Sequence, residues 1–385
     1  MTPDIAIVGG GPAGLALAAI LERKGFNYIV YERGRADVPP RGGCLDLHPG
    51  SGQRAMKEAG VFDLFKKYSR DGPATIHKVF DKDGNHATGW GEGRDAPEID
   101  RFRLRDALMT AIPKEKVVWE KRVESSERDE NGQVVLTFAD GSTASGFKLV
   151  VGADGVASKI RHLVHDTKPI FTRHVYLSGK IHPTNPFYPK LKAMAGEGSM
   201  IVMGKRHHMF NQCQGDGHYR VDLAFEGDED FSEKLVDIGS ADACRKFLLQ
   251  DDHFGTFSPT LREIIENAEG PFHPWLLYYF PPDKLNWKTV PGVALIGDAA
   301  HVTTPFVGDG ANCALRDTFI LADKLEEFGI TPEAVTEYEK EMFPWATDVI
   351  TRSRHSESLF YADDAPDGFV EMMKKFPLVG AADHK

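Results

Sequence analysis

The chain has few of the features that mark several common classes of protein. Its 385 residues include only four cysteines, and none of them forms the C-x-x-C spacing of a zinc site or a redox dithiol. The 46 Lys and Arg residues are fewer than the 57 Asp and Glu residues, which gives a net charge of −11. This charge disfavours binding to nucleic acid or to an anionic membrane surface.

Long hydrophobic runs and metal motifs are also missing. No apolar stretch approaches the roughly 20 residues that cross a bilayer, and no signal-peptide pattern opens the chain. The 15 histidines form neither an H-x-x-x-H nor an H-E-x-x-H pattern. We therefore expect a cytoplasmic protein, a monomer or weak dimer, that acts on a small molecule and uses no metal, membrane or nucleic acid.

The start of the chain has the pattern of a dinucleotide-binding unit. Asp4–Val8 is a short apolar run that predicts a strand, and Gly9–Gly14 reads G-x-G-x-x-G. Leu15–Lys24 has helical spacing that ends at Gly25, and Asn27–Glu32 predicts a second strand. Strand, glycine turn, helix and strand together indicate a βαβ unit of a parallel sheet.

Each glycine of this turn has a physical role in binding a dinucleotide. Gly9 permits the tight turn, Gly11 lets the backbone approach a pyrophosphate, and Gly14 lets helix and strand pack closely. Glu32 ends the second strand, where an acid holds ribose hydroxyls. The alternative is a glycine-rich turn with a structural role alone. The predicted cofactor-binding residues of this unit are Gly9, Gly11, Ala13, Gly14, Glu32 and Arg33.

Further along the chain, turn signals and changes of hydrophobic period indicate more elements. Residues 71–95 resemble a hairpin or an irregular excursion, Val134–Phe138 predicts a strand before an Asp-Gly turn, and Lys148–Gly152 predicts a buried strand. Alternating strands follow from about residue 170 to 280. From Thr331 the spacing predicts long C-terminal helices, interrupted at Pro344.

Two later motifs indicate which dinucleotide is bound. The first is Gly152-Ala153-Asp154-Gly155 with Ser158 and Arg161, and the second is Gly297-Asp298-Ala299-Ala300-His301 followed by Pro305 and Gly308-Asp309-Gly310. With the N-terminal turn, they resemble the three signatures of the class A flavin monooxygenases. The chain has no second G-x-G-x-x-G, which argues against flavoproteins of the disulfide-reductase type.

This resemblance implies FAD as the cofactor and NADPH or NADH as a transient co-substrate. It implies that Asp298 contacts the ribityl chain and that Asp154 supports the region shared by FAD and NADPH. For Asp298 the residues alone agree, because it follows the apolar strand Val293–Ile296. For both aspartates the alternative is a turn-capping role.

The same resemblance implies further cofactor contacts. Arg105 is the implied FAD contact of the segment Glu98–Arg105, with Arg101 as the alternative, and Arg41 is expected to meet flavin phosphate or NADPH. A helix that starts near Gly310 would direct its positive end toward reduced flavin. The residues assigned to this last region are Pro305, Gly308, Gly310, Ala311 and Asn312.

Asp309 lies between Gly308 and Gly310, beside the expected pyrimidine edge of the flavin. Its carboxylate has two possible roles: it caps the following helix, or it faces the flavin and repels the anionic reduced form. We predict the capping role, because the G-x-G sequence must first start the helix.

Within class A, the sequence resembles most closely the tetracycline-inactivating (TetX-like) monooxygenases. The residues that carry this likeness are Gly42–His48, Gly50–Gln53, Pro97–Ile99 and Ile296–His301. Where that group has a glutamine, a histidine and an arginine that hold tetracycline, this chain has Ser178, Arg220 and Ser199. We therefore expect tetracycline to be a poor substrate. The predicted substrate-binding residues are Ser178, His208, His218 and Arg220.

The resulting prediction is an α/β protein with a Rossmann-type FAD-binding domain interleaved with a β-sheet substrate domain, followed by C-terminal helices. Its implied reaction is hydroxylation of a small aromatic, enolic or polyketide-like molecule by O2 through a flavin C4a-hydroperoxide, without an amino-acid nucleophile. The alternatives are an FAD oxidase and a non-catalytic flavin-binding or small-molecule-sequestering protein. The predicted FAD domain comprises residues 1–73, 95–170 and 285–330, the substrate domain 74–94 and 171–284, and the C-terminal helices 331–385.

Overall fold

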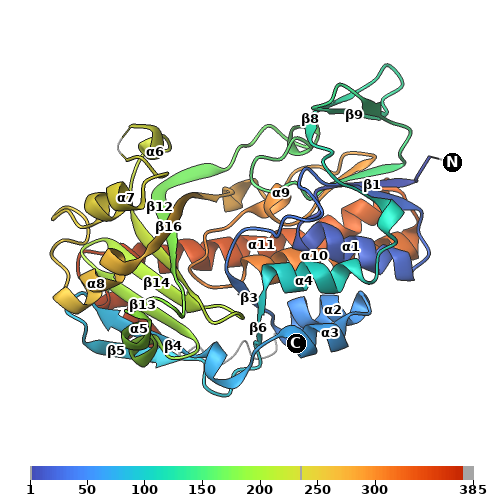
Figure 1. Ribbon diagram of the computed structural model, residues 1–385. Coiled ribbons are helices and arrows are strands. Elements are labelled where there is room, and N and C mark those ends of the chain that lie inside the picture. The colour runs from blue at the N-terminus through green and yellow to red at the C-terminus, as the bar shows by residue number, and fades with distance from the viewer. Residues whose placement is uncertain (1, 235, 376–385) are drawn as a thin grey trace. The chain divides into compact units, whose positions relative to one another are not determined.

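The computed structural model describes residues 2–234 and 236–375, which divide into two compact units (Figure 1). Of the predicted C-terminal helical region, residues 376–385 lie outside the described residues. The first unit comprises residues 2–69, 101–170 and 278–353, and the second comprises residues 70–100, 171–277 and 354–375.

A five-stranded parallel sheet organises the first unit, in the order β17-β11-β1-β2-β7. Its strands are β1 (Ile5–Val8), β2 (Tyr28–Tyr31), β7 (Val117–Val118), β11 (Leu149–Gly152) and β17 (Val293–Leu295). Every residue of β1 and β11 is buried, as is typical of a parallel sheet covered on both faces. Ile5 pairs with Leu149 and Val8 with Gly152, so the loops after these two strands leave the sheet at the same edge.

Helix α1 (Pro12–Arg23) follows the glycine turn and packs against α4 and α10. It begins at Pro12 rather than at the predicted Leu15, because proline is well suited to the first turn of a helix. The helix ends before Gly25, whose φ of +75° suits glycine. The other helical segments of this unit are η1 (Pro49–Gln53), α2 (Arg54–Glu58), α3 (Phe62–Tyr68), α4 (Arg101–Met109), η3 (Lys114–Lys116), η4 (Arg161–Leu163), η5 (Pro282–Lys284), α9 (Asp298–His301) and α10 (Gly310–Phe328).

A small antiparallel sheet of the first unit confirms one predicted hairpin. Its strands are β8 (Val123–Arg128), β9 (Val134–Phe138) and β10 (Thr143–Ala144), and the short strand β3 (Cys44–Asp46) lies elsewhere in the unit. The turn between β9 and β10 contains Gly141 with a φ of +80°, as an Asp-Gly turn requires.

A seven-stranded mixed sheet organises the second unit, in the order β16-β12-β15-β14-β13-β4-β5. Alternate residues of its strands, such as Leu177, Met209 and Leu223, point into an apolar core together with α5, α7 and α8. Its elements are η2 (Gly72–Thr75), β4 (His77–Asp81), β5 (His86–Trp90), β6 (Glu98–Asp100), β12 (Ile170–Ile181), α5 (Tyr188–Ala195), β13 (Ser199–Gly204), β14 (His207–Cys213), β15 (Tyr219–Glu226), α6 (Phe231–Lys234), α7 (Ala241–Leu248), α8 (Pro259–Asn267), β16 (Glu269–Tyr279) and α12 (Asp367–Lys375). The predicted hairpin in residues 71–95 is confirmed as β4 and β5.

The prediction of a break at Pro344 is wrong. Helix α11 (Pro332–Phe360) continues through this residue. Proline removes one backbone hydrogen bond, but Met342, Ala346 and Ile350 around it are almost fully buried. Their packing stabilises the helix on both sides of the proline. None of the helices that the structure describes is both long and apolar enough to span a bilayer.

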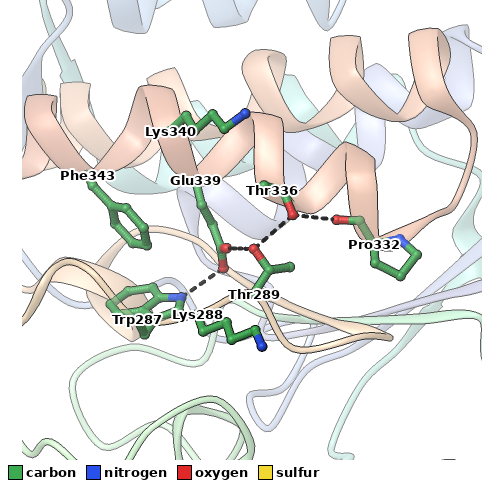
Figure 2. Close-up of a pocket in the computed structure, with 8 residues that line it drawn as sticks. All are labelled: Trp287, Lys288, Thr289, Pro332, Thr336, Glu339, Lys340 and Phe343. Atoms are coloured by element: carbon green, nitrogen blue, oxygen red, sulfur yellow. Dashed lines mark hydrogen bonds between the residues drawn. The ribbon is translucent and has the colours of Figure 1, made fainter.

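A buried carboxylate joins α11 to the loop before β17. Glu339, with 3% of its surface exposed, accepts hydrogen bonds from Trp287 Nε1 at 2.8 Å and Thr289 Oγ1 at 2.5 Å (Figure 2). Thr336 extends this chain of bonds to the first turn of α11 through the carbonyl of Pro332. All the partners of Glu339 are neutral, and burial raises the pKa of its carboxyl group. The bonds therefore have a structural role.

Candidate active site

The glycine turn after β1 has one closely packed side and one open side. Gly9 has a φ of +112°, and a Cβ atom on it would lie 2.3 Å from the carbonyl oxygen of Ala153. A Cβ atom on Gly14 would lie 2.0 Å from the carbonyl oxygen of Gly9. At Gly11, in contrast, a Cβ atom would meet nothing within 4 Å, and no side chain caps the amides at the start of α1. The open side therefore presents free backbone N–H groups, as an anion site requires.

Glu32 lies beside this turn, directly after β2. Its Oε2 accepts a hydrogen bond from the N–H of Gly10 at 2.5 Å, and its Oε1 accepts one from the N–H of Gly34 at 2.6 Å. An ionised carboxylate has about four acceptor positions, so these two bonds leave capacity for ribose hydroxyls. The neighbouring Arg33 is exposed.

The predicted arginine contacts lie in different surroundings. Arg105 donates from Nη1 to the carbonyl oxygen of Val38 at 2.6 Å and so fixes the loop after β2. Arg41 is exposed in that loop. Arg101, the alternative to Arg105, is one of two arginines whose charge acts on Asp298; the other is Arg161. The cofactor roles of Arg105 and of its alternative Arg101 both stay predictions.

The carboxylate of Asp154 makes hydrogen bonds to its own loop. Its Oδ1 accepts from Ser158 Oγ at 2.5 Å and its Oδ2 accepts from the N–H of Lys159 at 2.6 Å. Burial raises the pKa of Asp154, and these bonds partly oppose that effect. Asp154 therefore stabilises the turn after β11, and its contact with a cofactor stays a prediction.

Asp298 begins the short helix α9 at the end of β17, on the same edge of the sheet as the glycine turn. Its side chain remains accessible, although the protein atoms around it raise the pKa of the carboxyl group. Charges on His301, Arg101 and Arg161 oppose this shift. Arg161 also donates to the carbonyl oxygens of Asp298 at 3.0 Å and Ala299 at 2.8 Å. Asp298 is thus an accessible acceptor on a fixed turn.

Asn312 fixes the residues after β3 to the first turn of α10. Its Oδ1 accepts hydrogen bonds from the N–H groups of His48 at 2.9 Å and Gly52 at 3.2 Å, and its Nδ2 donates to the carbonyl oxygen of Asp46 at 2.8 Å. Only 2% of its surface is exposed. The other residues predicted here are at least partly accessible: Pro305, Gly308, Gly310 and Ala311.

Asp309 occupies the N-cap position of α10, but the predicted side-chain cap is wrong. Its carboxylate makes no cap hydrogen bond. Instead, Oδ1 lies 3.1 Å from His48 Nδ1, and Oδ2 accepts from Arg352 Nη2 at 2.9 Å. The other ring nitrogen of His48 lies 3.1 Å from Asp46 Oδ2. The Asp309 carboxylate therefore binds His48 and Arg352 in place of the backbone N–H groups of α10, because a charged partner forms the stronger hydrogen bond.

The structure brings together a cysteine, a histidine and an aspartate that the sequence does not show as one motif. Cys313 Sγ lies 3.8 Å and 3.9 Å from the two ring nitrogens of His301, and His301 Nε2 lies 2.6 Å from Asp317 Oδ2. All three side chains are at most 3% exposed. The thiol is almost equally distant from both nitrogens and cannot reach a substrate, so the group is not a nucleophilic triad.

In the second unit, polar residues share the face of the large sheet opposite its apolar core. The strand pairing places Ser199, Gln212 and Arg220 in one row across β13, β14 and β15. Ser178 and Asp222 are direct partners in the next row. This face therefore contains three of the predicted substrate residues, Ser178, Arg220 and His208.

Arg220 is the centre of a half-buried cluster on this face. Its Nε lies 2.9 Å from both carboxylate oxygens of Asp222, and its Nη2 donates to Ser178 Oγ at 3.1 Å. Ser178 also donates to Asp222, and the guanidinium lies 5.2 Å from the centre of the Trp275 ring. The sequence analysis missed Asp222 and Trp275. The spacing of Arg220 and Asp222, two apart on a strand, could have indicated a shared face.

The two predicted histidines lie in different places. His208 is 1% exposed on β14, with Nε2 3.0 Å from the hydroxyl of Tyr176, and burial lowers its pKa well below the usual value. His218 lies in the turn between β14 and β15, where its Nδ1 is 2.5 Å from Asp216 Oδ1. The structure therefore places His208 on the polar face and His218 at the end of a hairpin.

The first unit fits an extended ligand with phosphates at its centre and hydroxyl groups on both sides. The open side of Gly11 suits the phosphates, Glu32 suits a ribose, and the accessible Asp298 suits further hydroxyls. These are the chemical groups of FAD. Within residues 2–234 and 236–375, no three His, Cys, Asp or Glu side chains are arranged to hold a metal ion.

Comparison with known proteins identifies the class. The family model of the FAD binding domain matches residues 2–182 and 289–353, more than half of the chain, so the chain belongs to this family. It is 27% identical to monooxygenase penA of Penicillium thymicola over 94% of this chain and 96% of that protein. It is also 27% identical to the 3-amino-4-hydroxybenzoate 2-monooxygenase PtnB3 of Streptomyces platensis, over 94% and 90% of the two chains.

The chain is an FAD-dependent monooxygenase with the α/β fold of this family. The solved structure of tetracycline destructase Tet(51) superposes with a TM-score of 0.71, is 21% identical, and covers 97% of this chain and 95% of that one. At this identity the two proteins share the fold, and the closer likeness to the tetracycline-inactivating group stays a prediction.

The network around Asp309 predicts a pH-dependent stability. Burial alone would lower the pKa of His48, but Asp309 and Asp46 raise it to about 9. A histidine with a raised pKa stabilises the fold fully below its unfolded pKa near 6.5, and this contribution is lost as the pH rises through about 9. Asp309→Asn should lower the pKa of His48. For each pKa unit by which it does so, we expect the free energy of unfolding that is lost between low and high pH to become smaller by about 1.4 kcal/mol.

Urea unfolding of both proteins between pH 6 and pH 10 measures this effect. Asp63→Asn, at an almost fully exposed aspartate of the first unit, is the control and should retain the wild-type pH profile. Identical profiles for wild type and Asp309→Asn would contradict a charged His48.

Because one side of Gly11 is open, a larger residue at this position should let the protein fold but should prevent it from binding the cofactor. We expect Gly11→Val to unfold at nearly the wild-type urea concentration, because its Cβ meets no protein atom. It should lose FAD, because the side chain occupies the approach of the pyrophosphate. Gly50→Val, at the other glycine with an ordinary φ and nothing within 4 Å, is the matched control. Full flavin occupancy in Gly11→Val, measured by visible absorbance, would show that the turn is only structural.

Proposed function

We propose that this monooxygenase hydroxylates a small aromatic, enolic or polyketide-like molecule, with NAD(P)H as the reductant and O2 as the source of oxygen. The observation that supports this most is the cluster of Ser178, Asp222, Arg220 and Trp275 on the polar face of the second sheet. A charged side chain with fixed direction and a flat aromatic ring suit a planar molecule that bears an oxygen acceptor.

Arg220 is proposed to bind an oxygen of the substrate. Its bonds to Asp222 and Ser178 use Nε and Nη2, so the N–H groups of Nη1 are available to donate to a phenolate, enolate or carbonyl oxygen. Because Asp222 is only 4% exposed, its contact with Arg220 is protected from water and holds the guanidinium firmly. His208 lies next to Tyr176 on the same face, and because only 1% of its surface is exposed, its contact with the substrate stays a prediction.

The relatives support an aromatic substrate. PtnB3 is named for hydroxylation of 3-amino-4-hydroxybenzoate, a planar molecule with acidic and hydrogen-bonding groups. A substrate of this chemical class would match both the guanidinium and the indole ring. The proposal for this chain is limited to the class, since the identity is 27%.

The chain holds the cofactor in position and leaves the oxygen chemistry to it. Bound FAD supplies the transfer of one oxygen atom from O2 once NAD(P)H has reduced it. The glycine turn and Glu32 hold the adenosine half, and Asp298 accepts hydrogen bonds from the ribityl hydroxyls. The remaining proposed contacts are Ala13, Arg33, Arg41, Arg105, Asp154, Pro305, Gly308, Gly310, Ala311 and Asn312.

NAD(P)H oxidation by the holoprotein tests the proposal against phenols, anthraquinones and tetracyclines. We expect at least one phenol or anthraquinone to accelerate NAD(P)H oxidation and to give a product heavier by one oxygen atom. Tetracycline should be turned over poorly, because each buried polar partner left unpaired costs about 1–3 kcal/mol. Arg220→Gln should raise KM about tenfold or more for the accepted substrate, whereas Arg206→Gln, at an exposed arginine in the turn between β13 and β14, should not. Hydrogen peroxide as the only product would instead indicate an oxidase.

A further inference from the structure

A buried ion pair lies directly behind the turn that carries Asp298. Asp317, on α10, is 1% exposed, and His301, the last residue of α9, is 3% exposed. Asp317 Oδ2 accepts a hydrogen bond from the N–H of Gly297 at 2.8 Å and lies 2.6 Å from His301 Nε2. One carboxylate oxygen therefore holds both ends of the short segment whose first helical residue is Asp298.

The backbone at this segment depends on the contact with α10. Gly297 has a φ of +59°, and a Cβ atom on it would lie 3.1 Å from Cβ of Ala314 on α10. Helix α10 thus approaches the turn closely, and the Asp317 carboxylate is the group on this helix that accepts the Gly297 N–H. The contacts of α10 with Gly297 therefore fix the direction in which the chain leaves β17 at Asp298.

The same pair also affects the charge of Asp298. Burial alone would lower the pKa of His301, but the neighbouring Asp317 carboxylate raises it well above its usual value, which favours the imidazolium form. Burial raises the pKa of Asp298, and the charges of His301, Arg101 and Arg161 oppose this rise. The Asp317 charge also acts on the thiol of Cys313 and the hydroxyl of Tyr338, and both groups stay protonated because their pKa values are raised.

We propose that Asp317 and His301 are positioning residues for FAD, which fix the direction of the Gly297–Asp298 turn so that the Asp298 carboxylate can accept hydrogen bonds from the ribityl hydroxyls. This inference rests on the proposed contact between Asp298 and FAD. Asp317 is too deeply buried to touch a ligand, so it acts on the cofactor through Asp298 and not directly.

Titration of apoprotein with FAD, followed by flavin fluorescence, tests this pair in a double-mutant cycle. We expect Asp317→Asn and Asp298→Asn each to raise the Kd for FAD at least tenfold. The double variant should bind no more weakly than the weaker single variant, because both changes remove the same contact. Two results would overturn the proposal. One is a Kd in the double variant that is raised by the product of the two single fold-changes, and the other is an unchanged Kd in Asp317→Asn.

The pH dependence of binding gives a second readout that a purely structural role would not change. Loss of the Asp317 charge leaves His301 neutral, which raises the pKa of Asp298 and protonates it at a higher pH. The Kd of Asp317→Asn should therefore rise as the pH falls from 8 to 6, relative to the wild type. An Asp317→Asn profile parallel to that of the wild type would contradict the effect on charge.

Two further variants separate loss of folding from loss of positioning. Asp317→Asn combined with His301→Gln retains a neutral hydrogen bond in place of the ion pair, and it should fold and still bind FAD weakly. Glu339→Gln changes another buried carboxylate of the first unit, and its Kd should equal that of the wild type. If Asp298→Asn binds FAD normally, the proposed contact of Asp298 fails. If only the Asp317 variants bind normally, that contact stands and the positioning role fails.

Discussion

Parallel strand pairing is the constraint on which the candidate cofactor site depends. The order β2-β1-β11-β17 places the carboxyl ends of four strands at one edge, although the strands come from residues 5–8, 28–31, 149–152 and 293–295. The contact is close, since a Cβ atom at Gly9 would lie 2.3 Å from the carbonyl oxygen of Ala153. Only a glycine at this position allows the first and second motifs to approach each other in this way.

The two units divide the chemistry between them. The first presents free helix amides and carboxylates, which suit phosphates and hydroxyls. The second has a sheet with an apolar face and a polar face, and on the polar face the half-buried Arg220 pairs with the buried Asp222. Removal of one partner of such a pair is costly, because the other charge is then left unpaired. The chain therefore supplies direction and charge, while the cofactor supplies reactivity.

Local signals in the sequence predicted the βαβ unit, the hairpins and the start of α10 at Gly310. These features depend on glycine positions and hydrophobic period, which neighbouring residues determine. The role of Asp309 could not be predicted in this way, because its partners His48 and Arg352 are far away in the chain. The same holds for Asp317, whose contact with Gly297 becomes visible only when α10 lies beside β17. At Pro344 the packing of α11 outweighed the local preference for a break.

The most direct test of the central claim is a comparison of FAD, FMN and riboflavin as ligands of the apoprotein by calorimetric titration. If Glu32 and the glycine turn hold the adenosine half and the pyrophosphate, while Asp298 holds the ribityl chain, FAD should bind at least a hundredfold more tightly than FMN. Riboflavin should bind more weakly than FAD for the same reason. Equal affinity for FAD and FMN would contradict a site in which three separate segments of chain hold one dinucleotide.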